Sequence, residues 1–160
     1  MKKFRVGNGY DVHRLAEGLQ LTLGGVKIEH DKGCVAHSDG DAVIHALCDA
    51  LLGAAALGDI GKHFPDTSDE FKGIDSRILL RRTASLLRQK GWQIGNVDCT
   101  IVLQRPKVAP YIEQMRQEMA NAMAIDTDEV AVKATTTEKL GFTGREEGVA
   151  AYAVALIFHD

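Results

Sequence analysis

The chain has 160 residues, about the length of one domain, and we expect a single catalytic or binding domain over residues 1–160. Its net charge of −3 and its lack of a basic run argue against nucleic acid as a partner, because nucleic-acid binders contact phosphates through clustered lysine and arginine. Hydrophobic residues make up 45% of the chain and aromatic residues only 6%, so we expect a core of aliphatic side chains.

Strands, helices and loops follow from hydrophobic periodicity, capping residues and turn residues. From the N-terminus onward, we expect a strand over Phe4–His13, a β-hairpin over Leu21–Ile28, a helix from Ser38 to Gly58 or Gly61, a loop over Asp59–Ser68, a helix over Ser76–Lys90, a strand over Gly95–Gln104, a helix over Pro110–Ala124, and strands over Glu129–Thr135 and Val149–Phe158. This order indicates an α+β domain, with helices packed on one face of a mixed β-sheet and a small N-terminal β-hairpin. Alanine and valine occupy both faces of the last strand, so we expect another subunit to cover the second face of the sheet.

Particular residues mark the ends and faces of these elements. Gly24 and Gly25 suit the hairpin turn, and Ser38 with Asp41 would form a capping box at the start of the first helix. The side chains expected in the core are Ile78, Leu79, Ala84, Leu86 and Leu87 of the second helix, Val97, Cys99, Ile101 and Leu103 of the middle strand, and Ile112, Met115, Met119 and Met123 of the third helix.

Cysteine usage and the N-terminus both bear on location. Three widely spaced cysteines with no C-x-x-C pair predict neither a disulfide framework nor a thiolate zinc site. The start Met-Lys-Lys-Phe-Arg lacks the apolar stretch of a secretory signal, and the apolar run Ala42–Leu57 contains His45 and Asp49, which would be costly in lipid. We therefore expect a cytoplasmic protein that does not enter a membrane.

A first polar cluster lies in the N-terminal strand. Alternate side chains of a strand point the same way, so Asp11 and His13 share one side while Val12 faces the other. With His45 from the first helix, they would form a three-ligand zinc site that leaves a fourth position open. The ordinary interpretation is also possible, because Asp-x-His occurs by chance and a single helical histidine is more often a core or surface residue.

The helix that carries His45 begins in a second polar cluster, Ala36–Asp41. At about 3.6 residues per turn, Asp41, His45, Cys48 and Asp49 share one stripe. The free backbone N–H groups at such a helix end bind anions readily. We interpret Asp41 as a cap, Asp49 as a partner of His45 and Cys48 as a packing residue. The other histidines, expected at the surface or in loops, are His30, His63 and His159.

A third polar cluster runs from Lys133 to Gly148. Locally it predicts a Thr-x-x-Glu capping box followed by a glycine turn. A second hypothesis is that threonine hydroxyls and backbone amides surround phosphate oxygens while Glu138 binds a divalent cation. Oxygen ligands and phosphates together suit Mg²⁺ or Mn²⁺.

Taken together, these clusters resemble the 2-C-methyl-D-erythritol 2,4-cyclodiphosphate synthases of the non-mevalonate isoprenoid pathway. The matching motifs cover essentially the whole chain in the same order, and they are Gly-Tyr-Asp-Val-His, Ala-His-Ser-Asp-Gly-Asp, Gly-Asp-Ile-Gly-Lys-His-Phe-Pro-Asp-Thr, Gln-Arg-Pro-Lys and Thr-Thr-Thr-Glu-Lys-Leu-Gly-Phe-Thr-Gly-Arg. The resemblance implies a homotrimer with active sites between subunits. It also implies a phosphorus–oxygen lyase that converts 4-diphosphocytidyl-2-C-methyl-D-erythritol 2-phosphate into the 2,4-cyclodiphosphate and CMP, through attack of the 2-phosphate on the β-phosphorus.

Residue roles follow from the same motifs. The resemblance implies Zn²⁺ on Asp11, His13 and His45, with a second cation, Mg²⁺ or Mn²⁺, on Glu138 and the substrate phosphates. It implies that His37 and Thr136 stabilise the transition state. The other residues implied to contact the substrate are Val12, Ser38, Asp59, Ile60, Gly61, Phe64, Pro65, Asp66, Thr67, Ser68, Leu103, Gln104, Arg105, Pro106, Lys107, Val108, Ala109, Thr135, Thr137, Phe142 and Arg145. Tyr10 stands where phenylalanine is common, and Arg105 stands at a variable position.

Two other classes of protein must be set beside this one. A nucleotide-binding or regulatory module would need cationic side chains and backbone amides, but no Lewis acid beside the phosphates. A zinc hydrolase would use metal-bound water and would benefit from a dedicated general base near the metal. The zinc set with its open position argues against the first class, and the alternative roles of Asp41 and Asp49 argue against the second.

Overall fold

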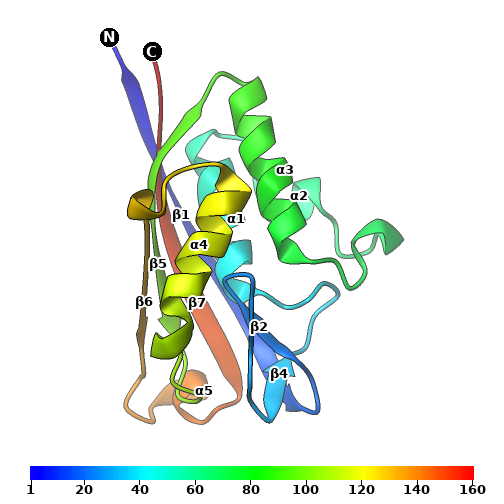
Figure 1. The fold of residues 1–160 in the computed structure, drawn as a ribbon. Coiled ribbons are helices and arrows are strands. Elements are labelled where there is room, and N and C mark those ends of the chain that lie inside the picture. The colour runs from blue at the N-terminus through cyan, green and yellow to red at the C-terminus, as the bar shows by residue number, and fades with distance from the viewer.

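Residues 1–160 are described by a computed structural model, in which helices cover one face of a five-stranded mixed sheet (Figure 1). The strand order is β4-β1-β7-β5-β6, and only the β5–β6 pair is parallel. The bounds of these strands are Lys3–Glu17 for β1, Lys32–Cys34 for β4, Gln93–Val102 for β5, Val130–Thr135 for β6 and Gly148–His159 for β7. The short strands β2 (Leu21–Leu23) and β3 (Val26–Ile28) pair with each other as a separate antiparallel ribbon.

Three helices of twelve or more residues form the second layer. Helix α1 (Ala42–Ala54) packs on β1 and β7, α4 (Ile112–Met123) packs on β6, and α3 (Ser76–Gln89) packs against both of these helices. The shorter helical segments are α2 (Ile60–His63), α5 (Gly141–Gly144) and the 3₁₀ turns Asp69–Phe71, Ala109–Tyr111 and Thr127–Glu129. None of the helices is both long and apolar enough to cross a bilayer.

The α+β class and the mixed sheet are as predicted, whereas several boundaries differ. Helix α1 begins after Asp41 rather than Ser38, because the Asp41 carboxylate accepts the N–H of Ile44 and caps the helix. It ends at Ala54, before Gly58, because Ala56 and Gly58 adopt positive φ angles of 58° and 92°. The predicted loop Asp59–Ser68 contains the short helix α2.

The core is aliphatic, as the composition predicts, and all of the side chains expected from the middle strand are buried. Met115, Met119 and Met123 are also buried. Ile78 was expected in the core but is 36% exposed, because the buried stripe of α3 runs through Leu79, Leu80 and Leu87 instead. The buried face of α3 is therefore shifted from the predicted one, with Leu80 in the core and Ile78 outside it.

The outer face of the sheet is apolar and exposed in the single chain. Its exposed apolar side chains are Phe4, Val6, Tyr10 and Val12 of β1 and Tyr152 and Val154 of β7. β1 and β7 are neighbours, and Tyr10 is paired directly with Tyr152. A contiguous apolar patch of this kind is typical of an interaction surface.

Helix α1 approaches β1 closely enough to exclude side chains at two glycines. A Cβ atom on Gly9 would lie 1.8 Å from the carbonyl oxygen of Ala46, and one on Gly7 would lie 2.0 Å from that of Ala50. This contact fixes the position of His45, which lies one residue before Ala46, relative to the strand that carries Asp11.

We expect Gly9→Ala to lower the free energy of unfolding by about 3 kcal/mol, the upper end for overpacking, because the helix must move off the strand. Gly53→Ala is the matched control: Gly53 belongs to α1 and has no atom within 4 Å of an added Cβ. The control should be neutral or stabilising by about 0.5–1 kcal/mol. Thermal or urea unfolding measures both, and equal stability of the two variants would contradict the close approach.

Candidate active site

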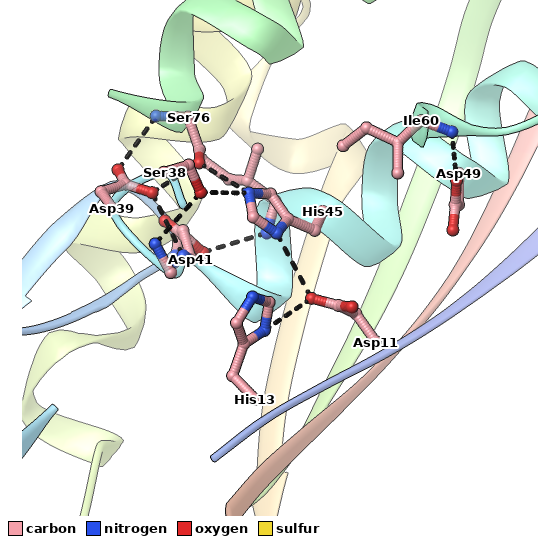
Figure 2. A network of polar contacts seen from close by, with 12 residues as sticks. Asp11, His13, Ser38, Asp39, Asp41, His45, Asp49, Ile60 and Ser76 are labelled. Carbon is pink, nitrogen blue, oxygen red and sulfur yellow. Dashed lines mark hydrogen bonds and ion pairs between the residues drawn. The ribbon is translucent and has the colours of Figure 1, made fainter. Parts of the chain in front are cut away.

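Asp11, His13 and His45 come together at the junction of β1 and α1 (Figure 2). Asp11 and His13 share the inner face of β1 because their positions differ by two, and His45 lies in the first turn of α1. The three side chains are 26%, 13% and 12% exposed, respectively. One potential ligand atom from each residue lies within 4.8 Å of the others. The predicted cluster is therefore present in the fold.

The donor atoms suit a cation. Oδ2 of Asp11 lies 2.9 Å from Nδ1 of His13 and 3.4 Å from Nδ1 of His45. Although they are close, Asp11 Oδ2 and His13 Nδ1 are buried and have no aligned hydrogen-bond partner. Buried polar atoms are rarely left in this state, so their convergence favours an ion between them. One carboxylate and two imidazoles are a ligand set that binds zinc and leaves a coordination position open.

The electrostatics of these three side chains support the same conclusion. Burial raises the pKa of Asp11, but the neighbouring imidazoles of His13 and His45 lower it by more. The net effect is a pKa below the ordinary value of an aspartate. Burial lowers the pKa of His45, but Asp11 outweighs this effect and the net shift is upward. Both shifts have one cause, a site that favours a positive charge beside the Asp11 carboxylate.

The other members of the predicted helix stripe have structural roles. Asp41 is fully buried and accepts N–H groups of Gly24, Gly25 and Ile44, so it ties the β2–β3 turn to α1. Burial, followed by the charge of Asp39, raises the pKa of Asp41 to about 6.

Asp49 and Cys48 complete the stripe. Asp49 was expected to partner His45, but its carboxylate accepts the N–H of Ile60 at 2.7 Å. Cys48 is buried, and burial raises the pKa of its thiol to about 12, which agrees with a packing role. His30 lies in the loop between β3 and β4, as predicted, although its side chain is only 8% exposed.

A cavity of about 410 Å³ opens beside the three predicted metal ligands. The residues that line it and were predicted from the sequence are Asp11, His13, His37, Ser38, His45, Ile60, Gly61, Phe64 and Asp66. Sequence reasoning missed its apolar wall, which consists of Val35, Ala36, Phe71, Ile74 and Leu79. Nε2 of His37 lies 2.8 Å from the carbonyl oxygen of Ser68, so this imidazole is linked to the segment that borders the cavity.

A second cavity, of about 300 Å³, lies at the other edge of the sheet. Its lining residues are Leu103, Gln104, Pro106, Lys107, Val108, Ala109, Ala134, Thr135 and Thr136, and all except Ala134 were predicted. Arg105 does not line it and instead pairs with Glu146 at 2.8 Å. The two cavities have no residue in common, and β7 and β5 lie between β1 and β6.

The turn after β6 differs from the predicted capping box. No helix starts at Thr135 or Thr136, and Oγ1 of Thr136 accepts the N–H of Glu138 within an exposed turn. The predicted site residues that line neither cavity are Val12, Asp59, Pro65, Thr67, Ser68, Arg105, Thr137, Glu138, Phe142 and Arg145. Val12 lies on the exposed outer face of β1, and the hydroxyl of Thr137 contacts Thr143 Oγ1 at 2.9 Å. The roles of these residues stay predictions.

Comparison with known proteins gives consistent matches. The model of the YgbB family matches residues 4–158. The 2-C-methyl-D-erythritol 2,4-cyclodiphosphate synthase of Azotobacter vinelandii is 66% identical over 153 residues, which covers 96% of this chain and 98% of the relative. The Pseudomonas fluorescens enzyme of the same name is 67% identical over equal shares of both chains.

Solved structures agree with these matches. The bifunctional IspDF of Campylobacter jejuni has a TM-score of 0.96 at 41% identity, covering 100% of this chain and 43% of that longer one. A CDP complex of Plasmodium falciparum IspF has a TM-score of 0.84 at 36% identity, covering 96% of this chain and 95% of that one.

Proposed function

The chain belongs to the YgbB family of 2-C-methyl-D-erythritol 2,4-cyclodiphosphate synthases, and we propose that it cyclises 4-diphosphocytidyl-2-C-methyl-D-erythritol 2-phosphate. An oxygen of the 2-phosphate attacks the β-phosphorus of the diphosphate. The bond from the β-phosphorus to the bridging oxygen breaks, and CMP leaves with that oxygen. The products are CMP and the 2,4-cyclodiphosphate, and no water is consumed.

The convergence of ligand atoms from Asp11, His13 and His45 is the observation that carries this proposal, with Oδ2 of Asp11 and Nδ1 of His13 buried and without a hydrogen-bond partner. The substrate supplies its own nucleophile, so the protein must fold an anionic molecule back on itself and offset the repulsion between its phosphates. A zinc ion held by these three residues would supply a Lewis acid for a phosphoryl oxygen. We propose that the carboxylate of Glu138, which is exposed beside Thr136, holds Mg²⁺ or Mn²⁺ together with the phosphates.

The chain's own residues bind and orient the two ends of the substrate. We assign the cytidine end to the cavity at Lys107 and Thr136, because the family resemblance places the cytidine pocket at these residues and the structure gathers them around one cavity. A solved relative described as a CDP complex supports a cytidine diphosphate as the ligand. We assign the phosphates and the methylerythritol to the cavity at His37 and Ile60. His37 and Thr136 would donate hydrogen bonds to charge that develops during the transfer.

The acids near the metal ligands favour cyclisation over hydrolysis. A hydrolase would need a free carboxylate to activate water. Asp41 and Asp49 both accept backbone N–H groups, and the carboxylate of Asp39 is held by Ser76. Each of these three carboxylates therefore has a structural hydrogen-bonding role, and none of them is dedicated to activating water.

We further propose a cytoplasmic homotrimer in which each active site combines the two cavities of neighbouring subunits. The apolar outer face of β1 and β7 would be buried between subunits. The two half-sites lie at separate places on one chain, which supports a shared site. The three buried free cysteines are consistent with a reducing compartment.

Mixing of two inactive variants tests the shared site. Asp11→Asn damages the metal half and Lys107→Ala damages the cytidine half, so each homotrimer should be nearly inactive. After joint unfolding and refolding at equal amounts, about one quarter of the sites should combine two intact halves and recover activity. Each variant refolded alone is the control. Confirmed mixed trimers with no recovered turnover would contradict sites built from two chains.

A further inference from the structure

The imidazole of His45 has polar contacts on both of its nitrogen atoms. Nδ1 faces Asp11, while Nε2 lies 2.9 Å from Oγ of Ser76 and 3.2 Å from Oγ of Ser38 (Figure 2). Ser76 is fully buried at the start of α3. The imidazole of His45, which belongs to α1, therefore contacts residues of both β1 and α3.

Ser76 also donates hydrogen bonds to a carboxylate. Its hydroxyl donates to Oδ1 of Asp39 at 2.5 Å, and its backbone N–H donates to Oδ2 of Asp39 at 2.9 Å. The backbone N–H of Asp41 donates to Oδ1 of Asp39 at 3.1 Å. Three hydrogen bonds hold the Asp39 carboxylate in one orientation behind Ser76.

When His45 is a ligand, the hydrogen bonds that link His45, Ser76 and Asp39 can run in only one direction. A nitrogen that binds a metal carries no proton, so an imidazole that ligates through Nδ1 carries its proton on Nε2. Asp39 as a carboxylate only accepts, so the hydroxyl hydrogen of Ser76 goes to Asp39 and its lone pair accepts the Nε2–H of His45. Ser38 lacks such a carboxylate, and its Oγ accepts the N–H of Gly40.

We propose that Ser76 and Asp39 are positioning residues for the metal centre, which fix the tautomer and the orientation of His45. This inference deepens the proposed function and rests on its metal site. Metal-binding histidines commonly donate their second N–H to a carboxylate or carbonyl, which orients the ring and strengthens the ligand. Here a serine hydroxyl stands between the imidazole and the carboxylate. Sequence reasoning assigned no role to either residue.

Zinc affinity measures this role without using turnover. Competition with a chromophoric chelator should show that Ser76→Ala raises the zinc Kd by about 10-fold to 100-fold, the range known for loss of such an outer partner. Cobalt(II) bound in place of zinc should show a changed visible spectrum, because the ring of His45 is no longer held in one orientation. Asp39→Asn should also raise the zinc Kd.

Two matched variants separate positioning from general stability. Thr83→Val removes another buried hydroxyl of α3, one that bonds to the carbonyl oxygen of Leu79 and does not contact His45. It should leave the zinc Kd and the cobalt spectrum unchanged, and the unfolding midpoints of both variants show how much each loses in stability. Ser38→Ala should raise the zinc Kd less than Ser76→Ala.

The outcomes are distinct. An unchanged zinc Kd and cobalt spectrum in Ser76→Ala, or a larger loss of affinity in Ser38→Ala, would overturn the positioning role while the metal site itself stands. Failure of the unaltered chain to bind zinc would overturn the metal site and the positioning role together. A raised Kd in Ser76→Ala with an unchanged Kd in Thr83→Val supports the inference.

Discussion

His45→Ala should lose its zinc and its turnover together, because it removes one of three ligands and leaves Asp11 with His13 alone. We expect one zinc equivalent per chain to disappear and kcat to fall by about three orders of magnitude or more, since metal assistance supplies several kcal/mol of transition-state stabilisation. His13→Ala should behave in the same way. Elemental analysis of the purified variants, together with steady-state kinetics, measures both effects.

Cys48→Ala is the control for this prediction. Cys48 lies on the same helix one turn from His45, but its thiol is buried and protonated, so the variant should keep its zinc and its turnover. A full zinc content in His45→Ala would show that this histidine is not a ligand and would refute the assignment.

Thr136→Ala should lower kcat by about 10-fold to 1,000-fold, the range for loss of one hydrogen-bond donor to developing charge. Its hydroxyl also accepts the N–H of Glu138, but this contact lies in an exposed turn that does not begin a helix. The unfolding midpoint, the metal content and the substrate affinity should therefore change little.

Thr136→Ser is the matched variant, because it keeps the hydroxyl and should recover much of the rate. A structural role would leave a different result. Loss of a capping hydroxyl would cost about 1 kcal/mol of stability and leave kcat within about two-fold of the unaltered chain. That outcome for Thr136→Ala would mean that Thr136 only stabilises its turn and takes no part in catalysis.

The sequence predicts the side-chain cluster of Asp11, His13 and His45 in part because the periodicity of a strand is strict. Asp11 and His13 must share a face of β1 once the strand exists, and a helix that starts near Asp41 places His45 in its first turn. The burial of the methionines in α4 follows from helical spacing in the same way. The place of each side chain on its own strand or helix depends on neighbours along the chain, whereas the meeting of His45 with Asp11 depends on the packing of α1 on β1.

Features that depend on distant partners could not be predicted. Strand β4 exists because it pairs with the end of β1, and three residues carry no strand signal of their own. Asp41 caps α1 in place of Ser38 because Gly24 and Gly25 supply two further N–H donors to its carboxylate. Ser76 reaches His45 only because α3 packs against α1, 31 residues along the chain.

The sequence could not show that the predicted substrate-binding residues would gather around two separate cavities. The first group of substrate-binding motifs ends at Ser68 and the second begins at Leu103, and nothing in their local pattern gives their separation in space. The fold puts β1 and β6 in different parts of the sheet, with β7 and β5 between them. A composite site between chains is implied by the family resemblance, and the separation of the two cavities on one chain supports that proposal.

Turnover in water enriched in oxygen-18 tests the central claim most directly, because cyclisation and hydrolysis differ in the attacking oxygen. If the 2-phosphate attacks the β-phosphorus, mass spectrometry of the products will show a cyclic diphosphate and CMP that contain no solvent oxygen. A linear methylerythritol 2,4-bisphosphate that carries one oxygen-18 would mean that water is the nucleophile, and it would contradict the proposed cyclisation.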